Sequence, residues 1–192
     1  MITLAVDVMG GDHGPEVTLA ATRRFLDQHP HARCLLVGLA DRRGDWTHPR
    51  ADWIDATEVV TMDDKPLMAL KKKKDSSMRL AIEQVRDGKA SVAVSAGNTG
   101  ALMALAMFTL GRLPGIDRPA IASIFPTIRG RTVVLDLGAN SASGAENLVQ
   151  FAVLGAVFAR LSCVSETPSV GLLNVGTEEM KGREEIREAC AI

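Results

Sequence analysis

The sequence has 192 residues, of which 46% are hydrophobic and 23% are charged, with a formal net charge of −1 at pH 7. Such a chain is long enough for an α/β domain with a substantial core, and its near-neutral charge argues against a general attraction to nucleic acid or acidic membranes. No uninterrupted apolar run is long enough for a bilayer, and the N-terminus lacks a basic region, so we expect neither a membrane span nor a secretory signal.

The first part of the chain alternates short apolar runs with segments of helical period. Residues 2–8 are apolar and predict a strand, and Pro15 occupies a first helical position. The residues His29-Pro30 end that helix, because the position before proline disfavours helical backbone. Two further strands are predicted at 33–38 and, near an edge of the sheet, at 51–60.

The middle of the chain predicts a helix, a strand and a second helix. Ser76 or Ser77 is a plausible N-cap, and Gly88 fits the position just beyond the helix end. Residues 91–95 form a strand that ends in a glycine-rich turn. The helix at 101–110 is apolar nearly all round, so we expect it to be buried on most sides.

The last part of the chain predicts strands at 118–125 and 131–138 and a long apolar helix at 145–161. A strand at 168–174 and a helix at 178–190 follow. This half is joined to the first by a turn-rich segment at 112–118, which is a candidate subdomain break.

Most of these strands are continuous apolar runs that alternate with helices. This pattern is typical of a mainly parallel sheet with helices on both faces. We therefore predict an α/β fold, organised as a single domain over residues 1–192.

Four predicted strand ends combine glycine with short polar side chains: MGGDHG at 9–14, SAGNTG at 95–100, DLGAN at 136–140 and NVGTE at 174–178. Ligands of open parallel sheets bind beyond the carboxyl ends of the strands. Helix N-termini there offer unpaired N–H groups and partial positive charge, and glycine permits close approach. Turn geometry alone explains any one of these segments, but four on one sheet edge predict an oxyanion site, for example for phosphate.

Other site chemistries find no support in the sequence. The phosphate-loop and dinucleotide-binding fingerprints are absent, and no aspartates cluster as divalent-cation ligands, so we expect no metal and no cofactor. The cysteines Cys34, Cys163 and Cys190 are odd in number and widely spaced. They suit a reducing compartment, and we expect a cytoplasmic protein without disulfides.

Six segments of the chain resemble, in order, the phosphate acyltransferase family of bacterial phospholipid synthesis: residues 5–15, 72–78, 91–104, 133–140, 147–155 and 171–182. The resemblance implies the α/β fold shared by phosphotransacetylases and isocitrate/isopropylmalate dehydrogenases. It also implies transfer of a long-chain fatty acyl group from acyl carrier protein to inorganic phosphate, which yields acyl phosphate for glycerophospholipid synthesis.

The chain departs from the family pattern in two ways. The family's chains are considerably longer, so the resemblance implies an absent C-terminal part that completes the sheet and the cleft. The family also continues the Gly-Ala-Asn segment with Val-Asp-Cys, whereas this chain reads Ser141-Ala142-Ser143. We therefore do not assign to this chain any role of the aspartate carboxylate and cysteine thiol in that family pattern.

The predicted phosphate-binding residues come from all four segments: Gly10, Gly11, Ser95, Gly97, Asn98, Thr99, Asn140 and Asn174. The catalytic candidates are His13, Asp12, Lys74 and Asp136. His13 is chosen because imidazole titrates near neutral pH, although Asp12 and His13 could equally cap the next helix. Asp7 is interpreted as structural, and Asp136 as part of the site.

The basic run Lys71–Lys74 has two interpretations. Such a run is usually a solvated face, but Lys73 and Lys74 could meet phosphate or the acidic surface of acyl carrier protein. Nucleic acid is disfavoured because the chain lacks overall basicity and interleaved aromatic residues.

Two other functions remain open: a phosphotransacetylase-like enzyme that uses acyl-CoA, and a non-catalytic module that binds phosphate or carrier protein. We also expect a homodimer and peripheral membrane contact. The helices at 101–110 and 145–161 carry long apolar faces, most of which we expect in the core, and the rest could serve a dimer or an acyl chain.

Overall fold

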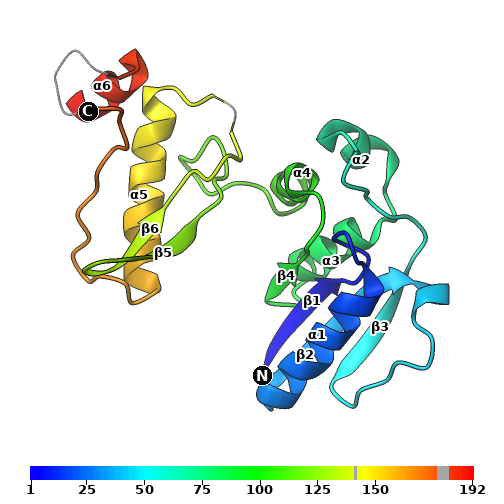
Figure 1. The fold of residues 1–192 in the computed structure, drawn as a ribbon. Helices are drawn as coiled ribbons and strands as arrows, with labels where there is room; N and C mark the ends of the chain where they lie inside the picture. Colours follow the sequence, from blue (N-terminus) through cyan, green and yellow to red (C-terminus); the bar gives the residue numbers. More distant parts are fainter. Residues whose placement is uncertain (141, 177–181) are drawn as a thin grey trace. The chain divides into compact units, whose positions relative to one another are not determined.

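The computed structural model describes residues 1–140, 142–176 and 182–192. The chain forms two compact units, a first unit of Met1–Gly111 and a second unit of Arg112–Ile192 (Figure 1). The boundary falls at the start of the segment 112–118, where the sequence indicates a subdomain break. The expectation that both units belong to one domain stays a prediction.

The first unit holds a four-stranded sheet in the order β3-β2-β1-β4, with all strands parallel. The expected edge strand, β3, lies at an edge, and α2 is a helix that the sequence did not predict. In chain order the elements are β1 (Ile2–Asp7), α1 (Pro15–Gln28), β2 (Ala32–Leu39), the 3-10 helix η1 (Ala40–Arg42), β3 (Ala51–Ala56), α2 (Pro66–Lys72), α3 (Ser77–Arg86), β4 (Val92–Val94) and α4 (Thr99–Leu110).

Helices cover both faces of this sheet. Successive side chains of a strand point to opposite faces. Leu4 and Val6 of β1 pack with Leu26 of α1, whereas Ala5 packs with Ala81 of α3. A strand that is covered on both sides must be apolar at every position, which explains its continuous apolar run. The predicted parallel α/β architecture is confirmed for this unit.

The helix α4 is less buried than its composition predicts. Its residues Ala101 and Leu105 are fully buried and pack with Met78 and Ile82 of α3. In contrast, the side chain of Phe108 is 62% exposed. The expectation of burial on most sides is therefore wrong for this helix, which is covered mainly by α2 and α3.

The second unit holds the antiparallel hairpin β5 (Ser123–Thr127) and β6 (Gly130–Val134), followed by α5 (Ala145–Leu161) and α6 (Glu184–Ala191). Only two residues connect β5 to β6, and a connection this short can join antiparallel but not parallel strands. The predicted strand at 168–174 is wrong, since no strand forms there. The predicted helix at 178–190 begins partly outside the described residues and is helical from Glu184.

Candidate functional site

The carboxyl ends of β1 and β4 meet around Asp7, the last residue of β1. Its side chain is only 2% exposed. The Ser95 hydroxyl donates a 2.7 Å hydrogen bond to Asp7 Oδ2 and accepts a 3.1 Å bond from the Gly97 N–H. The Met9 N–H donates to Asp7 Oδ1 at 3.2 Å. Asp7 therefore ties the turn that follows β1 to the turn that follows β4, which agrees with its interpretation as a structural residue.

Burial raises the pKa of Asp7 above its ordinary value of 3.8. The hydroxyl of Ser95, together with the N–H groups of Met9 and Gly10, opposes this effect by favouring the charged form. Because the folded chain holds this proton more tightly than the unfolded chain, Asp7 stabilises the fold at low pH. That stabilisation is lost as the pH rises from 3.8 through the folded-state pKa.

We expect the substitution Asp7→Asn to remove this pH dependence. The free energy of unfolding of the native chain should fall, relative to that of Asp7→Asn, as the pH rises above about 4. Urea denaturation between about pH 3 and about pH 7 measures the difference. Asp136→Asn is the control. Because the pKa of Asp136 is lowered, the free energy of unfolding of the native chain relative to this variant should rise, not fall, with pH. Identical pH profiles for the native chain and Asp7→Asn would contradict the raised pKa.

The two turns approach so closely that glycine is required at Gly10. A Cβ atom at Gly10 would lie 2.8 Å from Ser95 Oγ and 2.9 Å from Gly97 N. Gly11, at a φ of 92°, has a backbone conformation that other residues rarely adopt, and its Cβ would meet Ala96. Four predicted phosphate-binding residues, Gly10, Gly11, Ser95 and Gly97, are thus brought together.

The side-chain amide of Asn98 is engaged in hydrogen bonds within the protein. Asn98 is the N-cap of α4, and its Oδ1 accepts a 3.0 Å bond from the Ala101 N–H. Its Nδ2 donates to the carbonyl oxygens of Thr61, Met62 and Asp64 at 3.2, 3.0 and 2.9 Å. With its amide so engaged, the expectation that this side chain binds phosphate is corrected: Asn98 positions the turn.

At the start of α4, the described contacts leave backbone N–H groups without a hydrogen-bond acceptor. The first N–H groups of any helix have no intrahelical acceptor, and the described contacts give no partner to the N–H groups of Thr99 and Gly100. Thr99 is exposed, so this helix end is open to solvent. The partial positive charge of a helix N-terminus favours an anion at this point.

Asp12 and His13 lie on the first turn and are both exposed. Gly14 is the N-cap of α1, and no side chain caps this helix. The alternative that Asp12 and His13 serve as its caps is therefore wrong. They are accessible to a ligand in solution, and their catalytic role stays a prediction.

Two adjacent lysines have different surroundings. Lys73 Nζ donates to the Val59 carbonyl oxygen at 2.6 Å and to the carboxylate of Asp64. The hydrogen bond from Lys73 is the largest effect that lowers the pKa of Asp64. Lys73 therefore anchors the segment before α2, whereas Lys74 is exposed. The sequence did not single out Asp64, although a carboxylate close to a lysine run is a signal for such a pair.

In the second unit, Asp136 organises a turn. Its carboxylate accepts hydrogen bonds from the N–H groups of Ile121, Ala139 and Asn140 at 2.9, 3.2 and 2.8 Å, and from Asn140 Nδ2 at 3.0 Å. Burial raises the pKa of Asp136, but these hydrogen bonds outweigh it and hold the pKa below the ordinary value. Asn140 Nδ2 also donates to the Pro119 carbonyl oxygen at 3.0 Å. Both side chains thus have structural roles within this turn.

Asn174 lies in a described segment without regular secondary structure, so it does not follow a strand as predicted. Its Oδ1 accepts a 2.9 Å bond from the Val175 N–H. The remainder of the fourth glycine segment, from residue 177, lies outside the described residues. A phosphate-binding role for Asn174 stays a prediction.

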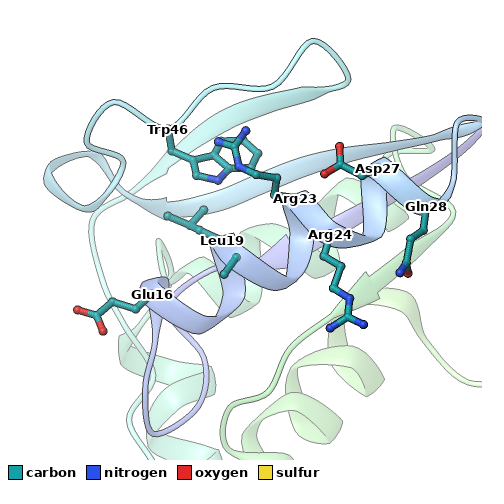
Figure 2. A pocket seen from close by; sticks show the side chains of 8 residues that line it. Glu16, Leu19, Arg23, Arg24, Asp27, Gln28 and Trp46 are labelled. Carbon is teal, nitrogen blue, oxygen red and sulfur yellow. The ribbon is translucent and has the colours of Figure 1, made fainter.

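The described residues also contain a surface pocket on α1, with a volume of about 610 Å3. Figure 2 shows its lining, which contains none of the predicted site residues: Glu16, Leu19, Ala20, Arg23, Arg24, Asp27, Gln28 and Trp46. Arg23 stacks over the Trp46 ring, 5.1 Å from its centroid. The mixed charges and the engaged arginine do not form an anion site.

The described residues show neither a group of metal ligands nor a membrane-spanning helix. No three His, Cys, Asp or Glu side chains in that part of the chain gather closely enough to hold a metal ion. None of its helices combines the length and apolar character needed to cross a membrane.

A family model described as "Fatty acid synthesis protein" matches residues 2–192. The chain belongs to the fatty acid synthesis protein family. Relatives from Delftia acidovorans and Verminephrobacter eiseniae, both named phosphate acyltransferase, are 59% and 62% identical to it over 190 residues. These findings confirm the resemblance read from the six sequence segments.

This member of the fatty acid synthesis protein family spans about half the length of the curated relatives that it matches. The alignments cover 98% of this chain but 55% of the Delftia relative and 54% of the Verminephrobacter relative.

Solved structures confirm the expected phosphotransacetylase-like fold of this chain. The EutD phosphotransacetylase from Staphylococcus aureus is similar at a TM-score of 0.68 and 16% identity, over 99% of this chain and 62% of that chain. A branched-chain phosphotransacylase from Enterococcus faecalis V583 is similar at a TM-score of 0.53 and 13% identity, over 83% of this chain and 51% of that chain. At these identities the likeness establishes the fold alone.

Proposed function

We propose that this chain transfers a long-chain fatty acyl group from acyl carrier protein to inorganic phosphate, with the start of α4 as its phosphate-binding site. The observation that carries the proposal is the exposed start of α4, where the N–H groups of Thr99 and Gly100 are available beside two interlocked glycine turns. Membership of the fatty acid synthesis protein family and the name phosphate acyltransferase of its relatives support this reaction class.

The chemistry requires little covalent participation by the protein. A phosphate oxygen attacks the carbonyl carbon of the thioester, the C–O bond forms, the C–S bond breaks and the thiolate leaves and takes up a proton. Phosphate is itself the nucleophile, so the protein must hold it, place the thioester and stabilise the developing oxyanion. In the proposal Thr99 and Gly100 hold phosphate, Lys74 adds positive charge, and His13 protonates the leaving thiolate.

The substitution Thr99→Pro tests the backbone donor directly. Thr99 is the first residue of α4, a position that tolerates proline, and Asn98 has a ψ of 109°, close to the extended values that precede proline. Losing one N–H donor should lower kcat/KM for phosphate by on the order of 10²-fold. Calorimetric titration with inorganic phosphate should show the matching loss of affinity.

Thr99→Ala is the matched control, because it removes the hydroxyl and keeps the N–H. It should change kcat/KM by only a few-fold. A loss in Thr99→Ala as large as that in Thr99→Pro would assign phosphate binding to the hydroxyl, and no effect in either would contradict this site.

One assay separates the proposed function from its alternatives. Free thiol released from palmitoyl-carrier protein or from palmitoyl-CoA is followed with and without phosphate. Phosphate-dependent release from the carrier protein alone supports the proposal, whereas release from the CoA ester alone indicates a phosphotransacetylase. A folded chain that binds phosphate and releases no thiol is a binding module. The expected homodimer, cytoplasmic location and peripheral membrane contact are retained as predictions.

A further inference from the structure

The segment around α2 presents apolar side chains to solvent. Met62, Leu67 and Met68 are 55%, 63% and 40% exposed, although all three are large and apolar. They lie within a short stretch that folds onto α4 through the fully buried Ala69. An exposed apolar cluster with a polar rim is typical of a surface that binds another molecule.

The rim of this cluster is basic. Five of the seven lysines in the chain fall within residues 65–74, although the chain as a whole carries a net charge of −1. Lys73 is engaged by Asp64. The α2 surface consists of the three exposed apolar residues together with three exposed lysines of this stretch, Lys65, Lys71 and Lys72.

The α2 surface is fastened next to the candidate phosphate turn. Asn98, the N-cap of α4, holds the carbonyl oxygens of Met62 and Asp64. On the same turn, a Cβ atom at Gly100 would lie only 3.0 Å from Pro66 Cγ. Figure 1 shows α2 beside α4, and the two helices are in contact. A molecule bound to α2 is therefore held beside the site that is proposed to take phosphate.

We propose that the α2 surface is the docking surface for the acidic carrier protein that delivers the acyl thioester, an inference that rests on the proposed function. Opposite charges steer and orient such an encounter, and flexible methionines adapt to an apolar patch on the partner. The exposed Asp63 and Asp75 interrupt the basic rim. They would repel an anionic lipid surface, whereas a folded protein can place its own charges around them.

The double substitution Lys71→Glu/Lys72→Glu tests the charges. We expect the dissociation constant for acyl carrier protein, measured by calorimetry on the 192-residue chain, to rise at least about ten-fold and to depend less on ionic strength. The control is Lys89→Glu at the opposite end of α3, whose side chain is 62% exposed and which should bind as the native chain does. Equal losses in both variants, or none in either, would overturn the proposal.

A second pair of variants tests the exposed apolar residues of the α2 surface. Leu67→Ser should weaken carrier binding several-fold, and Val17→Ser, at a residue of α1 that is 54% exposed, should not. Binding to vesicles of equal parts phosphatidylglycerol and phosphatidylcholine is measured in parallel. If the lysine variants lose vesicle binding and keep carrier binding, the surface faces a membrane and the proposal is wrong.

A small acyl donor separates this inference from the proposed function. Phosphate-dependent thiol release from an acyl-pantetheine thioester does not involve the carrier protein, so Lys71→Glu/Lys72→Glu should leave it unchanged. Absence of release from this donor in the native chain contradicts the proposed function, whereas the calorimetric titration still decides the docking surface. Loss of release in the double variant would place these lysines in the reaction site and overturn the docking role.

Discussion

Replacing Gly10 with alanine is expected to lower the free energy of unfolding of the first unit by about 4 kcal/mol. The new Cβ would lie 2.8 Å from Asp7 Oδ2, 2.8 Å from Ser95 Oγ and 2.9 Å from Gly97 N. Asp7 is 2% exposed and Gly97 N belongs to the backbone, so neither has room to retreat. Relieving the clash separates Ser95 from Asp7 and leaves a buried carboxyl group without its hydroxyl donor.

Urea denaturation followed by tryptophan fluorescence measures this loss, because the only two tryptophans, Trp46 and Trp53, both lie in the first unit. Gly44→Ala is the control: Gly44 has a φ of 52° and open space around its Cβ position, so only the backbone strain of about 1 kcal/mol is expected. If Gly10→Ala is no less stable than Gly44→Ala, the two turns do not interlock as described.

The first unit was largely predictable because its signals are local. A continuous apolar run marks β1, Pro15 fixes the start of α1, and His29-Pro30 fixes its end. The meeting of Gly10 with Gly97 followed from one further rule, that parallel neighbouring strands bring their carboxyl ends to the same edge.

The second unit was less predictable because its apolar residues are compatible with several strand registers. The two-residue turn Ile128-Arg129, rather than the hydrophobic pattern, makes β5 and β6 antiparallel. The apolar stretch at 168–174 has no strand partner among the described residues, so its composition alone did not make it a strand.

Neighbouring side chains of one chemical type could not be told apart from sequence. Lys73 and Lys74 are equivalent in the sequence, but Lys73 reaches Asp64, while Lys74 points to solvent. The contacts of Asn98 were also only partly predictable from the sequence. Its N-cap position is a local signal, but its contact with Asp64 spans 34 residues and depends on where α2 packs.

Asn98→Ala is expected to lower the free energy of unfolding of the first unit by about 3 kcal/mol. Loss of the N-cap of α4 accounts for about 1 kcal/mol. The remainder comes from the carbonyl oxygens of Thr61, Met62 and Asp64, which lose their shared donor in a partly buried position. The same tryptophan-detected urea titration measures the change.

Asn98→Asp separates the two contributions. Aspartate is as good an N-cap as asparagine and favours the positive end of the helix dipole. If capping were the whole role of Asn98, this variant would match the native chain. The structure predicts the reverse: a carboxylate would face three carbonyl oxygens with no proton to donate, so Asn98→Asp should be at least as unstable as Asn98→Ala. The α2 surface should then detach from α4, and carrier-protein binding should weaken together with stability, because the same amide holds both in place.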